Sequence, residues 1–117
     1  MKASLSMRQF DFNAIEQPRL AVTLKGGAVI NLELPTAGHV ELLQREIPHL
    51  RERIDKHGLS GIHRYYAILA ELMSCNAENL TFTADDLEKE YRITLSDMIE
   101  FYTVYLQFID EAKSAKN

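Results

Sequence analysis

Few residues in this chain are of the types that bind a metal ion or act as a nucleophile. The sequence contains four histidines, His39, His49, His57 and His63, and one cysteine, Cys75. No two of the histidines are four residues apart, the spacing that places a pair of imidazoles on one face of a helix to share a metal ion. A nucleophilic thiol needs a base beside it, and no motif around Cys75 indicates one. We therefore predict no metal site and no catalytic nucleophile.

Two other motifs resemble catalytic or cofactor sites but have a simpler structural explanation. Asp85 and Asp86 are adjacent carboxylates of a kind that general acid and base catalysis can use. Acids in the first turn of a helix also satisfy free amides and the helix dipole, and we favour that role. Gly26-Gly27 lacks the following helix and the Lys-Ser or Lys-Thr pair of a phosphate-binding loop, so we assign it to a turn. The sequence thus predicts a protein that is not an enzyme and has no cofactor.

The second half of the chain contains two copies of a helix-start motif. In a capping box, a threonine hydroxyl accepts a hydrogen bond from the amide three residues on, and the side chain there accepts one from the threonine amide. Thr83 with Asp86 and Thr94 with Asp97 both have this spacing. We expect a short helix at about residues 83–91 and a long one at about 95–113.

Apolar residues at helical spacing predict two further helices before these. Steps of three and four residues separate Val40, Leu43, Ile47, Leu50 and Ile54. Thr36 is suited to cap this helix, and Pro48 within it removes a backbone hydrogen bond, so we expect a kink or a split there. A second apolar pattern ends near Asn76. The expected ranges are about 36–57 and 61–75.

Two alternating apolar stretches on either side of the glycines predict a β-hairpin. A two-residue Gly-Gly loop would place Val22 opposite Asn31 and mix polar with apolar residues on one face. A three-residue loop, Lys25-Gly26-Gly27, instead pairs Val22 with Ile30 and keeps that face apolar. We predict the three-residue loop, with Gly27 at positive φ. Because an isolated hairpin is marginal in water, the apolar face must pack against helices or against another chain's strands.

Together these elements predict an α+β fold with one domain at residues 19–117. An N-terminal β-hairpin at 19–34 is followed by a small bundle of about four α-helices. The chain has 117 residues, of which 46% are apolar, which suffices for one core and not for two.

The first eighteen residues are the least patterned part of the sequence. They mix polar and apolar positions without a period and end at Pro18. We expect a partly ordered N-terminal arm at residues 1–18. Phe10, Phe12 and Ile15 are the side chains that would hold this arm against the body.

Composition and charge limit the environment and the partners. No apolar segment approaches the roughly 20 residues that cross a bilayer, and the lone cysteine suits a reducing compartment, so we expect a cytoplasmic protein. The net charge is −4, and residues 71–111 contain ten acidic residues against two basic ones. The basic residues of the first half alternate with acids, as on a solvated helix face where Glu41 would pair with Arg45. We predict no binding to nucleic acid or to a membrane.

The last predicted helix carries the most aromatic surface in the chain. We call its apolar residues the aromatic stripe: Met98, Phe101, Tyr102, Tyr105, Phe108 and Ile109. In one interpretation the stripe is the core of a helical bundle. In the other, part of it stays exposed as a groove for a partner helix, which tyrosine hydroxyls tolerate well. We take the stripe as the candidate partner-binding site; if it is exposed, Tyr105→Glu or Phe108→Glu should abolish binding without loss of helix.

The order of these features resembles a known family. In this chain, a polar arm is followed by a hairpin at Leu20–Leu34 and by Pro35-Thr36, which opens a helix. The segments Leu72–Asn76, Thr83–Leu87 and Asp97–Ile109 come next. Over about residues 9–117 this layout is similar to that of tail assembly chaperones encoded in Firmicutes prophages.

The resemblance implies a non-catalytic protein in the cytoplasm of a bacterial host. Such a chaperone coats the long, apolar, helical tape measure protein, helps to recruit the tail tube protein, and tends to self-associate. The alternative is a structural virion subunit, such as a connector or tail-completion protein, that would form a permanent ring.

Overall fold

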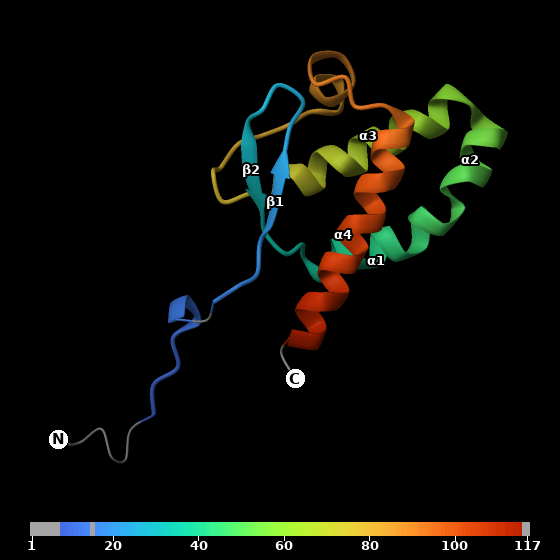
Figure 1. Ribbon diagram of the computed structural model, residues 1–117. Coiled ribbons are helices and arrows are strands. Elements are labelled where there is room, and N and C mark those ends of the chain that lie inside the picture. The colour runs from blue at the N-terminus through green and yellow to red at the C-terminus, as the bar shows by residue number, and fades with distance from the viewer. Residues whose placement is uncertain (1–7, 15, 116–117) are drawn as a thin grey trace.

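The computed structural model describes residues 8–14 and 16–115, and it confirms the predicted α+β fold (Figure 1). The strands β1 (Leu20–Thr23) and β2 (Val29–Leu32) form an antiparallel hairpin. The helices are α1 (Ala37–Glu46), α2 (Leu50–His57), α3 (Leu59–Met73) and α4 (Leu95–Ala115), and the shorter turns are η2 (Phe12–Ala14), η3 (Ile47–His49) and η4 (Asp86–Glu90). Residues 1–7 and Ile15 of the predicted arm, and the side chains of Ile54 and His57, lie outside the described part.

The hairpin has the register predicted for a three-residue loop. Leu20 pairs with Leu32, and Val22 pairs with Ile30. The loop glycines, Gly26-Gly27, have φ values of 110° and 102°, a conformation that costs glycine little. The apolar residues of both strands therefore share one face.

The two edges of the hairpin differ. The Asn31 carbonyl in β2 accepts from the Ala77 amide, and the Asn31 amide donates to the Glu78 carboxylate, both over 2.9 Å. Because Asn31 directs its backbone groups away from β1, its partner Ala21 must direct its own away from β2. The backbone groups of Thr23 point the same way. Among the described residues, no hydrogen bond was found that uses the backbone of Ala21 or Thr23. The outer edge of β1 is therefore free, whereas that of β2 is covered.

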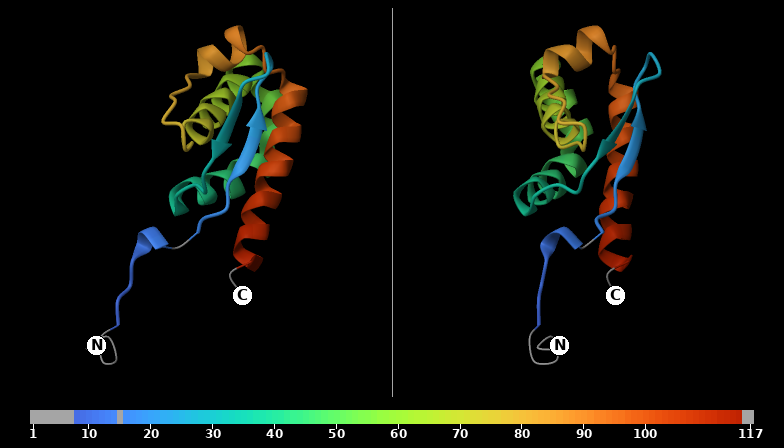
Figure 2. Two further views of the ribbon diagram at one scale, coloured as in Figure 1. Left: turned by 60° about the vertical axis from the view of Figure 1, so that its left-hand side comes forward. Right: turned by 90° about the vertical axis from the view of Figure 1, so that its left-hand side faces the viewer.

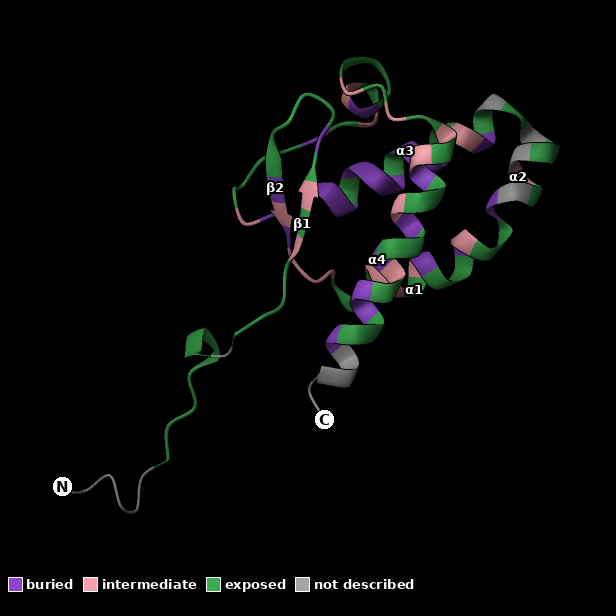
Figure 3. Cartoon of the chain, viewed as in Figure 1, coloured by how far each residue is buried: buried purple, intermediate pink, exposed green. Residues whose placement is uncertain are grey.

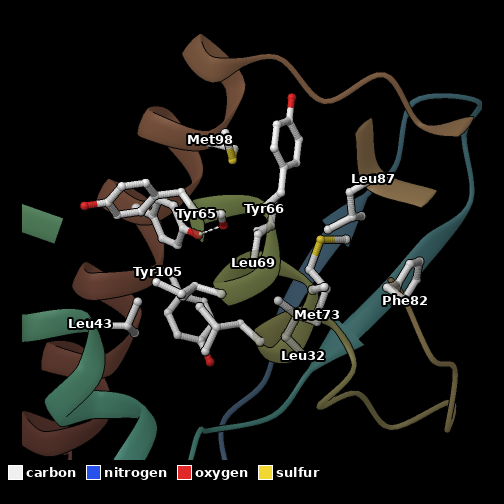
Figure 4. Close-up of a cluster of buried hydrophobic side chains, with 14 of the residues drawn as sticks. Leu32, Leu43, Tyr65, Tyr66, Leu69, Met73, Phe82, Leu87, Met98 and Tyr105 are labelled. Carbon is white, nitrogen blue, oxygen red and sulfur yellow. Dashed lines mark hydrogen bonds between the residues drawn. The ribbon is translucent and has the colours of Figure 1, made fainter. Parts of the chain in front are cut away.

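The apolar face of the hairpin is covered by the chain's own helices. In Figure 4, Leu32 of β2 lies against Met73 and Leu69 of α3, and Tyr65 and Tyr105 occupy the space toward α4. All five side chains are at most 2% exposed. Figure 3 shows the same distribution along the chain, with buried residues on α3, on one side of α4 and on the hairpin.

Pro48 splits the helix predicted at 36–57, as expected. The Thr36 hydroxyl caps α1 by accepting from the His39 amide over 3.3 Å. Near Pro48 the chain tightens into η3 and then resumes as α2. The split is stabilised from α3, because the Tyr65 hydroxyl donates to the Glu46 carbonyl at the end of α1 (3.0 Å).

A buried carboxylate joins the three helices around this split. Glu46 is only 2% exposed, and it accepts a hydrogen bond from Arg64 Nε of α3 over 2.7 Å. Nitrogen atoms of Arg45 and Arg53 lie 3.6 Å from the same carboxylate. The hydrogen bond from Arg64 is the largest reason why the pKa of Glu46 is lowered. Arg45 therefore pairs with Glu46 and not, as predicted, with Glu41, since a buried carboxylate needs a counter-charge more than an exposed one does.

Both predicted capping boxes are present. The Asp86 amide donates to the Thr83 hydroxyl (3.1 Å), and the Thr83 amide donates to the Asp86 carboxylate (3.2 Å). In the second box, the Asp97 amide donates to the Thr94 hydroxyl (3.1 Å), the Thr94 amide donates to the Asp97 carboxylate (2.8 Å), and α4 begins between the two residues. Local sequence therefore sets where both of these elements begin.

The short helix predicted at 83–91 is mostly a π-helical turn, η4. The Tyr91 amide donates to the Asp86 carbonyl five residues earlier (2.9 Å). Arg92 then takes a positive φ of 52°, and the Ile93 amide donates back to the Leu87 carbonyl (2.9 Å). This wide turn lets Leu87 stay fully buried while the chain reverses toward α4.

The described part of the N-terminal arm points away from the body in every view (Figures 1 and 2). Phe10 and Phe12 are 70% and 79% exposed, and their rings pack on each other with centroids 4.7 Å apart. These two side chains therefore do not hold the arm against the body, contrary to the prediction.

No helix in the described part of the chain is both long enough and apolar enough to span a membrane.

Candidate protein-binding site

The aromatic stripe lies mostly inside the protein. Met98, Tyr102, Tyr105, Phe108 and Ile109 are at most 7% exposed and belong to the core. These five residues of the predicted partner-binding stripe face the chain's own α3 and hairpin, as in the core interpretation of the stripe, and their role in partner binding stays a prediction. Phe101 is the exception: it is only partly buried and packs on the outside of that core.

The two central tyrosines of the stripe differ in their hydroxyl groups. The Tyr102 hydroxyl donates to the Tyr65 carbonyl over 2.6 Å. The Tyr105 hydroxyl is buried without a hydrogen-bond partner among the described residues. Desolvation raises the pKa of both groups above the ordinary tyrosine value, so both stay protonated at neutral pH. Neither hydroxyl is suited to act as a base.

An apolar pocket opens beside Phe101, between β1 and α4. In the left view of Figure 2, β1 lies between β2 and α4, so the free edge of β1 is on the side of this helix. The pocket encloses about 180 Å³. Its lining consists of Val22, Thr23, Leu24 and Lys25 from the hairpin, Leu69 and Met73 from α3, and Ile93, Asp97 and Phe101 at α4. We call this the β1–α4 pocket.

Two residues that line the β1–α4 pocket, Lys25 and Asp97, form a polar contact. The Lys25 ammonium donates to the Asp97 carboxylate and to the Arg92 carbonyl (2.8 Å), and we call this contact the Lys25 clamp. The hydrogen bond from Lys25 is the largest cause that lowers the pKa of Asp97 to about 2, and the hydrogen bonds with Thr94 are the next largest. The clamp ties the hairpin loop to the first turn of α4 and leaves the rest of the pocket apolar.

The titratable side chains elsewhere form ordinary pairs. Among the described residues, no three side chains of the His, Cys, Asp and Glu types gather as they would around a metal ion. His39 lies 3.2 Å from Glu71. Cys75 is partly buried, and desolvation followed by the charge of Glu33 raises its pKa, which disfavours the reactive thiolate. The β1–α4 pocket is therefore the strongest candidate site.

Comparisons with protein families, with curated proteins and with solved structures found no match for this chain.

Most residues of the pocket could not be placed in a site from the sequence. The alternating pattern predicts that Val22 faces the apolar side of the hairpin, and the helical pattern predicts that Leu69 and Met73 face inward. Neither pattern says that these residues meet Phe101 across a gap. The available signal was Lys25, a basic residue in a tight loop of a chain whose second half is acidic.

Proposed function

We propose that this chain is a non-catalytic chaperone that binds an apolar segment of another protein at the β1–α4 pocket. The observation that carries the proposal is the apolar hollow left open beside Phe101 after the chain has buried the rest of the aromatic stripe. An apolar concavity next to a free strand edge is a favourable place for another polypeptide to bury side chains.

Within this class, the resemblance favours a tail assembly chaperone. Its partners would be the tape measure protein and the tail tube protein of a prophage, in the cytoplasm of the bacterial host. An apolar side chain of the tape measure helix would insert between Val22 and Phe101, which lie on opposite sides of the pocket. The net charge of −4 would help to keep the complex in solution.

The size of the pocket indicates how such a chaperone would work. Burying one large apolar side chain contributes about 1.5–3 kcal/mol. A dissociation constant of about 1 μM requires roughly 8 kcal/mol, which one such contact does not supply. Stable coating of a long client would therefore require many weak contacts made by several copies side by side, whose combined avidity exceeds each single affinity.

Co-expression with the gene product encoded just downstream tests this function. We expect that product to be insoluble when expressed alone, and to become soluble and co-purify when this chain is present. A product that is equally soluble in both cases, or that never co-purifies, would count against the proposal. Mass spectrometry of purified particles separates the structural alternative, because a chaperone should be missing from mature tails.

A further inference from the structure

We propose that the N-terminal arm of one copy adds a strand to the free edge of β1 in a second copy, with Phe10 and Phe12 covering the β1–α4 pocket. The exchange is reciprocal, so that each copy gives one arm and receives one. The arm would occupy the same pocket as the proposed client, so a client must displace it. Failure of this inference leaves the proposed function standing.

The arm carries apolar surface that its own body does not cover. Phe10 and Phe12 are 70% and 79% exposed, which makes them the most exposed large apolar side chains among the described residues. They contact each other edge to face on an arm that projects away from the helices (Figure 2). Leaving two rings in water forgoes several kcal/mol of burial that a second chain can provide.

The spacing of the two rings fits strand addition at β1. Residues two apart lie on the same face of a strand, so Phe10 and Phe12 would both point to one side. The backbone groups of Ala21 and Thr23 point to the free edge at the same two-residue interval. An added strand with its rings on the side of Val22 would therefore place them over the pocket.

Pairing requires the short turn in the arm to extend. At present η2 is held by the hydrogen bond from the Ala14 amide to the Asp11 carbonyl (3.0 Å) and by the Asp11 side chain, which accepts from the Asn13 amide (2.9 Å). Extension gives up these exposed bonds. Pairing with Ala21 and Thr23 replaces them with strand hydrogen bonds in a more protected place.

The charges of the two surfaces do not oppose the contact. Residues 1–18 contain Lys2 and Arg8 against Asp11 and Glu16, so the arm has no net charge. The pocket is bordered by α4, where Asp97 lines it and the exposed Glu100 precedes Phe101, within a segment that has ten acids and two basic residues. A neutral arm therefore meets no net repulsion at this acidic surface.

The area involved favours two exchanged arms over one. An aromatic side chain buries at least about 150 Å². With both rings of both arms covered, about 600 Å² of ring surface is lost. The paired strands and the acceptor surface around the pocket would have to supply the rest of the roughly 1,200 Å² at the lower end for specific association. A single arm would supply about half of that, which is too little for a stable pair.

A second copy is a better acceptor than the arm's own body. Pro18 biases the preceding Gln17 toward an extended backbone, which continues the line of β1 instead of reversing it. Residues 8–19 span up to about 40 Å when extended, enough to cross the face of a neighbour. The long axis of the molecule, 65 Å against 30 Å for the next, reflects this projecting arm.

Sedimentation velocity of the full chain over a wide concentration range, with hydrogen exchange of single amides, tests the proposal. We expect a reversible dimer whose Ala21 and Thr23 amides are protected. The double variant Phe10→Ser/Phe12→Ser should weaken the dimer at least about tenfold and expose both amides. Leu80→Ser, which removes a 47% exposed apolar side chain from a loop outside the pocket, should change neither. Because all three side chains are exposed, each variant should fold.

Three results would overturn the proposal. First, the double variant could dimerise as tightly as the parent chain, which would mean that the arm does not form the contact. Second, the parent chain could stay monomeric with both amides unprotected, which would mean that nothing pairs with the free edge of β1. Third, the parent chain could stay monomeric with both amides protected, which would mean that the arm folds back on its own body.

Discussion

Three tyrosines hold the helices together through their hydroxyl groups. The Tyr65 hydroxyl donates to the end of α1, the Tyr66 hydroxyl to the carbonyl of Ile93 before α4, and the Tyr102 hydroxyl from α4 back to the carbonyl of Tyr65 in α3. Each bond joins elements that are distant in sequence. Tyr105 has the same burial but no such partner among the described residues, so its ring stabilises the core and its hydroxyl does not.

Replacing each of two tyrosines by phenylalanine tests this difference. Tyr102→Phe removes a buried hydrogen bond and should lower the free energy of unfolding by about 1 kcal/mol. Tyr105→Phe removes a buried hydroxyl without a partner and should leave it unchanged or raise it by about 1 kcal/mol. Urea unfolding of both variants measures this, and an equal loss in both would show that the Tyr105 hydroxyl has a partner in solution.

At the scale of single residues, the sequence identified the aromatic stripe but not which of its side chains are exposed. Of the stripe, Phe101 lines the β1–α4 pocket. The spacing of the aromatic stripe correctly placed Phe101 and Tyr105 on one helix face. Which of them reaches solvent depends on how α4 rotates against α3, and the chain offers apolar residues on other faces of α4, such as Ile99 and Val104. Because a helix pattern with apolar residues on several sides does not define one buried face, burial was not predictable here.

Among the elements, those governed by short-range chemistry were predictable. The glycine loop decided the hairpin register, the threonine caps decided where helices begin, and Pro48 decided where one is split. The cluster around Glu46 was not predictable, because Arg64 approaches it from another helix. The pocket was missed for the same reason: it lies between β1 and α4, which are separated by more than half of the chain.

The Lys25 clamp between the hairpin and α4 should make stability depend on pH. The folded protein lowers the pKa of Asp97 from 3.8 to about 2, chiefly through Lys25, so the clamp stabilises fully above about pH 4 and less as the pH falls toward 2. Asp97→Asn should reduce stability at neutral pH and flatten the loss in that window. Thermal unfolding across this pH range measures it.

The control for the clamp is an acid on the same helix without these contacts. Asp110→Asn changes charge by the same amount at an exposed position and should follow the curve of the parent chain. If Asp97→Asn also follows that curve, the clamp does not couple the hairpin to α4.

On the scale of the whole molecule, the proposals rest on two of the apolar features that the described residues leave outside the core. The core includes most of the aromatic stripe and the inner face of the hairpin. The two features are the β1–α4 pocket and the aromatic pair on the arm. Both proposals place an apolar segment at the β1–α4 pocket, a client segment in one and the arm of a second copy in the other, so the two occupants compete for it. Neither proposal needs the buried stripe.

The central claim is that another protein is captured at the β1–α4 pocket, and a pair of α4 variants tests it most directly. Phe101→Glu places a charge at the pocket, and Ile99→Glu places the same charge two residues away, on a different side of the helix. The measurement is the amount of the downstream gene product that co-purifies with each variant, after circular dichroism has shown that both are folded. We predict that Phe101→Glu loses the product and Ile99→Glu retains it. Retention by folded Phe101→Glu, or equal loss in both, would contradict the claim.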